Sequence, residues 1–357
     1  MKEKFFLTII IFISIWGCST ENDDNNSFLQ YSWEFADPID LNIDKHKIDE
    51  AFSHAEKLDF IYSIIVVRNG KIAAEKYFNG KDKYSIYSIK SVSKSFLSAA
   101  LGIAESKGMI SLNERLTDII DNYQSQITDT KFNEITLQNL ITMKAGLDGD
   151  RNIYSNVVNS SNWLSTIFSM NLINNPGVKF VYTTPGTHLL SAVLTASSGV
   201  SSLEFIEEHL TNKMGIEIND WRQDPQGIYF GGNDMFFTTR NMAVLGLLYL
   251  NEGKLNEIQI VPKDWITASL NDYSGGIGNW SVMKNIGYGY LWWLGEINEY
   301  KMYTAIGHGG QFVLCIPKLN LIVATNAFSD LWWDEANEQE TTILNIIGNY
   351  IIPAVNP

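Results

Sequence analysis

The chain has 357 residues, of which 45% are hydrophobic and 12% aromatic. This length allows a sizeable core, in one large α/β unit or in two interleaved domains. The chain carries 26 Lys and Arg against 40 Asp and Glu, a formal net charge of −14. Because such an excess of acid repels phosphate groups, we expect no nucleic-acid partner.

The N-terminus has the pattern of a secretory signal peptide over residues 1–17. Two lysines precede an apolar run over residues 5–16, which is too short to span a bilayer comfortably. Ile15, Gly17 and Cys18 resemble a bacterial lipobox, which implies that Cys18 is lipidated and becomes the first mature residue. The alternative is an uncleaved short anchor with an incidental cysteine.

This pattern predicts an exported bacterial lipoprotein of the cell envelope, on the periplasmic or outer face, held to the membrane through Cys18. Residues 18–30 are then a polar tether, and residues 31–357 form the folded part. With Cys18 lipidated, Cys315 is the only remaining thiol, so we expect no intrachain disulfide.

The first folded element is predicted to be a β-hairpin within residues 62–80, because two β-rich runs flank Asn69-Gly70. Residues 91 to about 252 are mostly of helical pattern, with examples at 96–107, 136–147, 186–199 and 238–253. We expect a Gly- and Asn-rich loop at 275–287, successive strands at 288–297, 302–317 and 319–328, and an amphipathic helix at 336–352.

Strands at both ends with helices between them predict one sheet assembled from distant segments, with a helical domain inserted into it. The α/β part would comprise residues 31–90 and 254–357, and the helical part residues 91–253. A functional site could then lie where the two parts meet.

The segment SVSKSF, residues 91–96, places three serines around Lys94. On a helix only residues three or four apart share a face, so Ser91 is the partner of Lys94, whereas Ser93 and Ser95 project elsewhere. Near the first turn, free backbone N–H groups favour negative charge on Ser91. A desolvated lysine can take the serine proton, so the pair indicates a serine nucleophile with a lysine base.

The serine-x-x-lysine spacing is weak by itself, because Ser281 and Lys284 share it within the Gly- and Asn-rich segment. Taken alone, Ser91 and Lys94 would more often mark a solvated helix start than a site. Motifs elsewhere in the sequence are needed to distinguish a functional site from a solvated helix start.

Ordered blocks along residues 60–352 resemble those of serine β-lactamase-related hydrolases: SVSKSFLSAALGIA, ITLQNLITMKAGL, FVYTTPGTHLLSAVL, GGNDMFFTTRNMAVLGLLYLNEG, YGYLWWLG and GHGGQFVLCIPKLNLIVATN. That family includes class C β-lactamases, D-alanyl-D-alanine carboxypeptidases, related esterases and 6-aminohexanoate-dimer hydrolase. The resemblance implies an α/β (α+β) fold of the β-lactamase/transpeptidase type, an antiparallel sheet flanked by helices with an inserted mainly helical domain.

The resemblance also implies roles for named residues. Ser91 matches the acylated serine, Lys94 its lysine, and Tyr182 the tyrosine that exchanges protons with the nucleophile and the leaving group. A tyrosine is a poor base at neutral pH unless a cation lies close by. Whether Lys94 or Tyr182 is the working base is left open, and the two are treated as a coupled pair.

Residues 308–311 stand where many relatives have lysine-threonine-glycine and the residue after it. The resemblance implies that His308, Gly309 and Gly310 bind substrate, the two glycines permitting close approach of a ligand. It further implies that the N–H groups of Ser91 and Gln311 form an oxyanion hole.

Two departures from the family pattern bear on the substrate. Thr184, also expected to contact substrate, stands where relatives have an asparagine, and His308 stands where they have a lysine that binds a carboxylate. Both changes favour an esterase or amidase over an efficient β-lactamase.

Other chemistries lack their motifs. There is no Gly-x-Ser-x-Gly elbow, no His-Glu-x-x-His and no phosphate-binding Gly-rich loop with lysine, so we expect neither metal nor cofactor. His188 is expected to be a helix or core residue rather than a catalytic one.

The sequence thus predicts a serine hydrolase that cleaves a small ester, amide or peptide through an acyl-enzyme on Ser91. A β-lactamase or D-alanyl-D-alanine carboxypeptidase is the alternative activity. A non-hydrolytic penicillin-binding or sensor lipoprotein is the alternative of another class.

Overall fold

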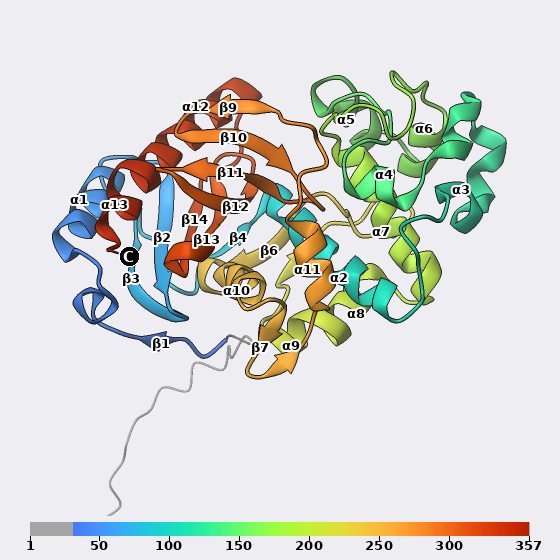
Figure 1. Cartoon of the computed structure of the whole chain (residues 1–357). Helices are drawn as coiled ribbons and strands as arrows, with labels where there is room; N and C mark the ends of the chain where they lie inside the picture. The colour runs from blue at the N-terminus through green and yellow to red at the C-terminus, as the bar shows by residue number, and fades with distance from the viewer. Residues whose placement is uncertain (1–30, 357) are drawn as a thin grey trace, which may run out of the picture.

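A computed structural model describes residues 31–356 of the chain (Figure 1). The predicted signal peptide and the whole predicted tether, Cys18 included, lie outside the described residues.

A mainly antiparallel sheet of nine strands forms the centre of the fold. Only the short edge strand β1 pairs in parallel with its neighbour β3. The strands, in their order across the sheet, are β1 (Glu34–Phe35), β3 (Lys71–Tyr77), β2 (Ile61–Arg68), β14 (Leu321–Ala327), β13 (Gln311–Ile316), β12 (Tyr300–Gly307), β11 (Trp293–Ile297), β10 (Met283–Tyr288) and β9 (Gly278–Trp280). The N-terminal hairpin therefore pairs with strands from the end of the chain, as predicted.

The hairpin turn at Asn69-Gly70 explains the join between β2 and β3. Both residues have positive φ, 52° and 76°, which is the geometry of the tight hairpin turns that these two residue types favour. The predicted hairpin is confirmed.

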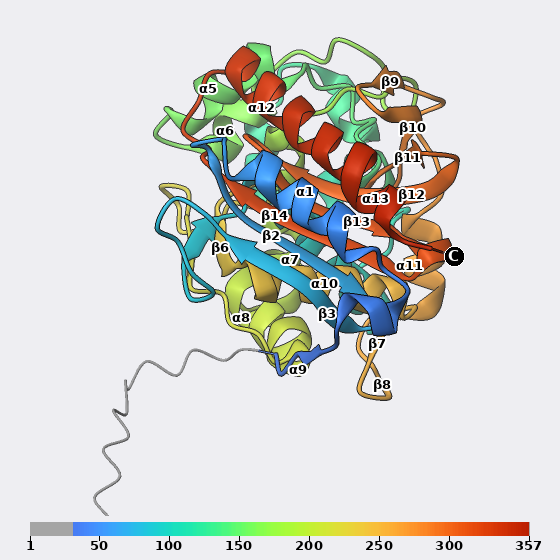
Figure 2. The ribbon, with the colours of Figure 1, turned by 90° about the vertical axis from the view of Figure 1, so that its left-hand side faces the viewer.

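The sheet is covered on both faces, so its strands are apolar on both sides. On β2, Ile64 and Val66 belong to one core and Ile65 and Val67 to the other. The core that contains Ile64 and Val66 is the first core. It is closed by α1 (Lys45–Ala55), α12 (Trp333–Ile346) and α13 (Ile352–Ala354), which cross one face of the sheet in Figure 2. On the opposite face α10 (Thr239–Leu250) packs against β14, β13 and β2.

The remaining helices lie to the right of the sheet and below its centre in Figure 1. The longest are α2 and α7, which contact each other and continue the second core. The helices are α2 (Ser93–Ser106), α3 (Leu116–Ile119), α4 (Leu137–Ile141), α5 (Asp150–Val158), α6 (Trp163–Phe168), α7 (Thr184–Ser198), α8 (Ser202–Ile206), α9 (Asn212–Met214) and α11 (Lys263–Ser269).

Several expected elements differ in detail from the observed ones. The expected loop at 275–287 contains β9 and most of β10, because short edge strands tolerate Gly and Asn. Residues 302–317 form two strands joined by a turn at 308–310, where both glycines have positive φ. Residues 288–297 are likewise split between β10 and β11, and the helix expected at 136–147 ends at Ile141.

The segment of helical pattern also contains strands. β5 (Asp220–Trp221) and β6 (Met235–Thr238) pair there, and β6 pairs with β4 (Ile86–Ser88) in a small second sheet. A further pair, β7 (Lys254–Leu255) and β8 (Ile258–Gln259), follows α10. Because β4 leads directly into residues 90–94, the small sheet holds the start of α2 in place.

Candidate active site

Ser91 and Lys94 lie together at the start of α2. Ser91 is in a single 3₁₀ turn, Lys90–Val92, that runs directly into the helix. The Nζ atom of Lys94 lies 2.9 Å from the Oγ atom of Ser91. The structure thus brings together the pair that helical spacing selects.

The neighbouring serines have structural partners instead. The hydroxyl of Ser93 donates to the carbonyl of Lys90 at 2.7 Å and accepts the N–H of Met235. The hydroxyl of Ser95 donates to the carbonyl of Leu291 at 2.8 Å. Ser91 is therefore the serine of this segment whose hydroxyl meets the lysine.

Lys94 is almost completely buried, with 1% of its surface exposed. Its Nζ atom lies 2.9 Å from the Oγ1 atom of Thr184 and 2.6 Å from the carbonyl oxygen of Gly232. Burial lowers the pKa of Lys94 to about 7, while the charges of Asp150 and Asp234 act in the opposite direction. An amine of this pKa is partly neutral at physiological pH and can accept a proton.

Asp150 completes the network behind Lys94. Its carboxylate accepts both the N–H of Thr184, at 2.5 Å, and the hydroxyl of Thr184, at 2.6 Å. Because the Thr184 hydroxyl proton points to Asp150, its oxygen can only accept a hydrogen bond from Lys94, as the Gly232 carbonyl must. Of the three partners of Lys94, only Ser91 can therefore donate a proton to it.

Gly232 reaches Lys94 because it lacks a side chain. A Cβ atom at this position would lie 2.6 Å from the Cγ2 atom of Thr184 and would overlap the hydroxyl of Thr187. The close packing against α7 brings the Gly232 carbonyl into hydrogen-bond range of the amine.

Tyr182 lies on the other side of the lysine. The centroid of its ring lies 5.0 Å from the Nζ atom of Lys94, and its phenol is close enough for Ser91 to influence its pKa. Burial, followed by the nearby charge of Asp150, raises the pKa of Tyr182 above the usual range, whereas the Ser91 side chain lowers it. Tyr182 is thus a neutral phenol, suited to passing a proton rather than to removing one.

Strained backbone supports the turn that presents Ser91. Lys90 and Asp234 both have positive φ, 49° and 60°, which non-glycine residues seldom adopt and which often accompanies function. Their side chains form an ion pair of 3.3 Å, and the hydroxyl of Ser88 donates to Asp234 at 2.9 Å. The Asp234 carboxylate therefore fastens the segment before the nucleophile.

The residues of the 308–310 turn are placed differently from the expectation. Gly309 and Gly310 do not line the pocket that contains Ser91, and Gln311 is fully buried. A Cβ atom at Gly309 would lie 2.5 Å from the carbonyl oxygen of Phe328, and one at Gly310 would overlap Ile343. Close packing within the protein, rather than a ligand, thus accounts for the two glycines.

Gln311 serves the same packing. Its side-chain amide donates to the carbonyl of Ala327 at 2.9 Å and accepts from the side chain of Asn326 at 2.9 Å. Gln311 also begins β13, which contacts the Lys90–Val92 turn that carries Ser91, and the expected contribution of its N–H to an oxyanion hole stays a prediction.

His308 does line the pocket, but its side chain is engaged elsewhere. Its Nε2 atom lies 3.0 Å from the carbonyl oxygen of Leu331, and its ring meets the edge of Trp333. Burial lowers the pKa of His308, which the Leu331 contact partly offsets. His308 is thus a neutral group that holds the segment before α12.

The pocket around Ser91 has a volume of about 490 Å³ and lies between the sheet end, α5, α7 and α12. Aromatic rings form much of its wall, since Tyr154, Tyr182, Trp293, Trp332 and Trp333 all line it. Such a cavity with a few polar groups is typical of a small-molecule site.

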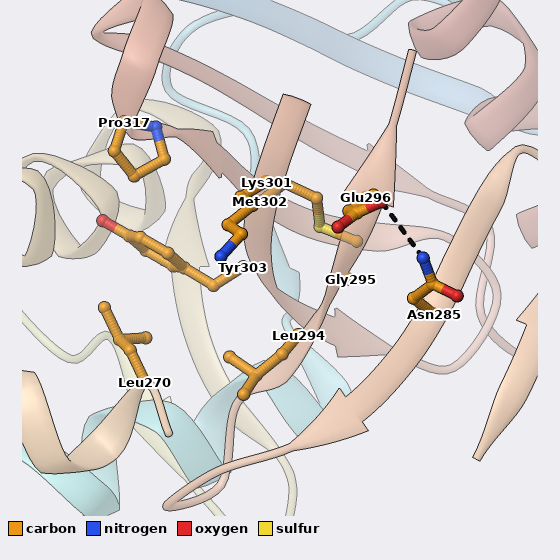
Figure 3. Close-up of a pocket in the computed structure, with 9 residues that line it drawn as sticks. All are labelled: Leu270, Asn285, Leu294, Gly295, Glu296, Lys301, Met302, Tyr303 and Pro317. Atoms are coloured by element: carbon orange, nitrogen blue, oxygen red, sulfur yellow. Dashed lines mark hydrogen bonds between the residues drawn. The ribbon is translucent and has the colours of Figure 1, made fainter. Parts of the chain in front are cut away.

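The strand β11 separates the Ser91 pocket from a second pocket on its opposite face (Figure 3). Trp293 of β11 faces the Ser91 pocket, whereas its neighbour Leu294 lines this one. Its polar groups include Glu296 and Asn285, joined by a hydrogen bond of 3.1 Å. No serine, threonine or cysteine lines it, so it offers no aliphatic hydroxyl or thiol for acyl transfer.

Other candidate residues have structural partners. Ser281 donates to the side chain of Asn345, and Lys284 to the backbone of Ser281, so that pair forms a turn between β9 and β10. His188 is fully buried, 3.0 Å from the carboxylate of Asp224, and is thus a core residue. Cys315 is buried and free.

Within residues 31–356, no cluster of three or more His, Cys, Asp and Glu side chains could hold a metal ion. In the same range no single helix is long and apolar enough to cross a membrane, although one pair bent by 80°, residues 184–198 with 202–214, passes by length and composition.

Sequence reasoning did not identify Asp150, Gly232, Asp234 and Glu340 as parts of the site. Asp150 opens a short helix after a glycine, which looks like ordinary helix-start chemistry. The GGND segment at 231–234 is a weak signal that could have been followed, since paired glycines within an apolar region often mark close backbone approach.

Comparison with known proteins agrees with this fold. The model of the Beta-lactamase family matches residues 62–331. An uncharacterised protein of Alkalihalophilus pseudofirmus is 26% identical over 305 residues, which cover 75% of this chain and 83% of that protein.

Solved structures share the fold at low sequence identity. "Putative 6-aminohexanoate-dimer hydrolase from Bacillus anthracis" has a TM-score of 0.71 at 20% identity, over 91% of this chain and 87% of that one. An octameric penicillin-binding protein homologue from Pyrococcus abyssi has a TM-score of 0.67 at 20% identity, over 90% and 78%. EstCE1, described as a hydrolase with promiscuous acyltransferase activity, has a TM-score of 0.69 at 13% identity, over 87% and 99%.

The fold is that of the β-lactamase/transpeptidase type, with a serine and a lysine joined at the start of a buried helix. The chain belongs to the Beta-lactamase family, a family of hydrolases, and the predicted family and fold class are confirmed.

Proposed function

We propose that this protein is a serine hydrolase that cleaves an ester or amide through an acyl-enzyme on Ser91. The observation that supports this most strongly is the hydrogen-bond network of Lys94, in which Ser91 is the one partner able to donate a proton. A buried amine with its pKa near 7 is suited to accept that proton as Ser91 attacks the carbonyl.

Tyr182 would pass the proton onward. As the tetrahedral intermediate collapses, its phenol donates to the leaving alkoxide or amine and is reprotonated from Lys94 beside it. Water then attacks the acyl group, and the same groups act in reverse. The proposal assigns the base to Lys94 and the acid to Tyr182, because burial holds the phenol neutral.

Stabilisation of the oxyanion would come from main-chain N–H groups of Ser91 and of the pocket-lining end of β12. That end runs against the turn before Ser91, since a side chain at Gly307 would collide with the carbonyl of Ile89. Ile306 and His308 flank Gly307 and both line the pocket. Each such donor typically contributes about 3 kcal/mol to lowering the barrier.

The pocket charges favour esters and amides over β-lactams and peptides with a free carboxylate. Thr184 is engaged with Lys94 and Asp150, and His308 with Leu331, so neither supplies a free charge for a substrate carboxylate. Glu340, on the pocket wall, would repel one.

The test is labelling of the purified protein with a fluorophosphonate, followed by mapping of the adduct and hydrolysis of p-nitrophenyl esters, amides and penicillin. We expect one adduct, on Ser91, that is lost in Ser91→Ala and kept in Ser281→Ala, together with ester turnover. Absence of an adduct, or its persistence in Ser91→Ala, would overturn the proposal. Labelling without turnover of any substrate would favour the sensor alternative.

We also propose that the chain is an exported lipoprotein carrying lipid on Cys18. The supporting pattern is Ile15, Gly17 and Cys18 after a short apolar run. In cells fed a palmitate analogue, the wild-type protein should take up the label and Cys18→Ser should not. Equal labelling of the two would exclude lipidation at this residue.

A further inference from the structure

Glu340 is an acidic residue of the pocket that takes no part in the acyl-transfer steps of the proposed hydrolysis. It lies on α12 and lines the same pocket as Ser91. Its Oε1 atom accepts the N–H of Gly309 at 2.8 Å. Its charge acts on Tyr182, which places the carboxylate close to the reacting groups.

The cations around the pocket are each matched with other acids. Lys90 pairs with Asp234 at 3.3 Å, and Arg151 with Asp334 at 2.9 Å. Lys94 is linked to Asp150 through Thr184. Among the ion pairs within residues 31–356, none involves Glu340.

The Glu340 carboxyl is buried without a cation beside it, and this burial changes its pKa. It raises the pKa of Glu340 to about 7, opposed only by the Gly309 hydrogen bond. A carboxylate in such a place is stabilised by any cation that enters the pocket.

Aromatic rings at the pocket mouth add a second attraction for a cation. Trp332 and Trp333 lie at the start of the helix that carries Glu340, and both line the pocket. They are 80% and 40% exposed. Aromatic faces attract ammonium groups, and quaternary amines in particular.

We propose that Glu340, with the Trp332 and Trp333 rings, binds a positively charged amine of the substrate. The natural substrate is then an ester or amide that carries an ammonium group, and Glu340 determines this specificity. The inference rests on the proposed serine hydrolase function and names its substrate class.

The test compares cationic esters with neutral esters of the same shape. One pair varies the acyl side: the p-nitrophenyl esters of 4-(trimethylammonio)butyrate and of 5,5-dimethylhexanoate. The other varies the leaving group: acetylthiocholine and 3,3-dimethylbutyl thioacetate. Within each pair only the charge differs, so the ratio of kcat/KM values measures recognition of the cation.

We expect the wild-type protein to prefer the cationic member of at least one pair by about tenfold or more, the contribution of a charged contact in a pocket. Glu340→Gln keeps an acceptor for the Gly309 N–H but removes the charge. It should bring the ratio near unity by raising KM for the cationic ester, since any change transmitted through Tyr182 acts on both members of a pair and cancels in the ratio. Glu338→Gln, the same change at an exposed position of α12, should keep the wild-type ratio.

Fluorophosphonate labelling of Ser91 and a circular dichroism spectrum like that of the wild type show that Glu340→Gln is folded. A wild-type ratio near unity in both pairs, or a preference that survives in Glu340→Gln, would overturn the inference.

Calorimetry separates this inference from the proposed hydrolysis. The Ser91→Ala variant should bind the cationic ester about tenfold more tightly than its neutral counterpart, and the double variant with Glu340→Gln should bind the two alike. Selective binding without any turnover in the wild type would keep the amine site and reject the hydrolase. Turnover without selective binding would support the hydrolase and reject the amine site.

Discussion

At the scale of single residues, the chemistry depends on where the protons of Lys94, Thr184 and Ser91 point. Asp150 fixes the Thr184 hydroxyl as an acceptor toward Lys94, which leaves the amine lone pair for Ser91. The carboxylate also raises the pKa of Lys94 that burial has lowered. In the proposed mechanism Asp150 is therefore a positioning residue that acts on Ser91 through Thr184 and Lys94.

This network makes a prediction about pH. In the proposed mechanism Lys94 is a base only when neutral, so the rate of fluorophosphonate labelling should rise with pH through about 7. Asp150→Asn removes the charge that raises the Lys94 pKa, so the inflection should move to lower pH. It also frees the Thr184 hydroxyl to compete for the amine, which should lower the maximal rate.

Asp148→Asn is the matched control, because Asp148 lies two residues away and does not line the pocket. Its labelling profile should follow the wild type. An inflection in Asp150→Asn at the wild-type pH would contradict the proposed coupling.

Tyr182 makes a prediction about leaving groups. If its neutral phenol protonates the departing group, Tyr182→Phe should slow hydrolysis of an ethyl ester or an amide by about 10²–10⁴-fold. A p-nitrophenyl ester, whose phenolate leaves without a proton, should suffer much less. Equal losses for both substrates would instead assign Tyr182 to activation of Ser91.

At the scale of elements, the site depends on how closely the 231–234 segment packs against α7. The Gly232 carbonyl reaches Lys94 only because no side chain separates the segment from Thr184 and Thr187. The same segment continues into β6. The carbonyl of Met235 in β6 accepts a hydrogen bond of 2.9 Å from the N–H of Ile89, which lies just before Ser91. Residues of α2, α7 and the 231–234 segment therefore fix the position of the Lys94 amine together.

Gly232→Ala tests this packing. We expect a loss of about 1–3 kcal/mol in the free energy of unfolding, the usual cost of overpacking. Labelling of Ser91 should also slow, because the displaced carbonyl no longer orients Lys94. Denaturant unfolding and labelling rates measure the two effects.

Gly149→Ala is the comparison, since its new Cβ atom would meet its neighbours at 3.6 Å and 3.7 Å, ordinary contact distances. It should retain stability and labelling. An equally mild effect at Gly232 would show that the segment can move without loss of function.

At the scale of the whole molecule, the buried amine lowers the stability of the fold. The pKa of Lys94 is about 7 in the folded chain against 10.5 as the reference value. Folding thus disfavours the charged form, and this cost grows as pH falls from 10.5 towards 7. Active sites commonly carry such costs.

Lys94→Met should therefore abolish labelling while raising the free energy of unfolding at pH 7 by about 1–3 kcal/mol, after allowance for lost hydrogen bonds. The gain should shrink as pH is raised towards 10, where the wild-type amine is neutral in both states. Lys57→Met, at an exposed position, should change stability by less than about 0.5 kcal/mol. Destabilisation by Lys94→Met at pH 7 would contradict this view of the site.

The sequence by itself determined the features that depend on local spacing and on ordered motifs. The Asn69-Gly70 hairpin, α2, α7 and α10 follow from turn chemistry and hydrophobic periodicity, although α10 packs on the sheet. Helical spacing selected Ser91 as the partner of Lys94, and the ordered blocks indicated the family.

Only the tertiary structure decided which groups face the pocket. Asp150 and Glu340 are distant from Ser91 in sequence, and nothing local distinguishes them from helix-start or surface acids. In the motif at 308–310, His308 lines the pocket whereas Gly309 and Gly310 do not, because the turn packs Gly309 against Phe328 and Gly310 against Ile343. Chemistry at a site depends on distances between side chains, and these are set by packing between elements rather than by order along the chain.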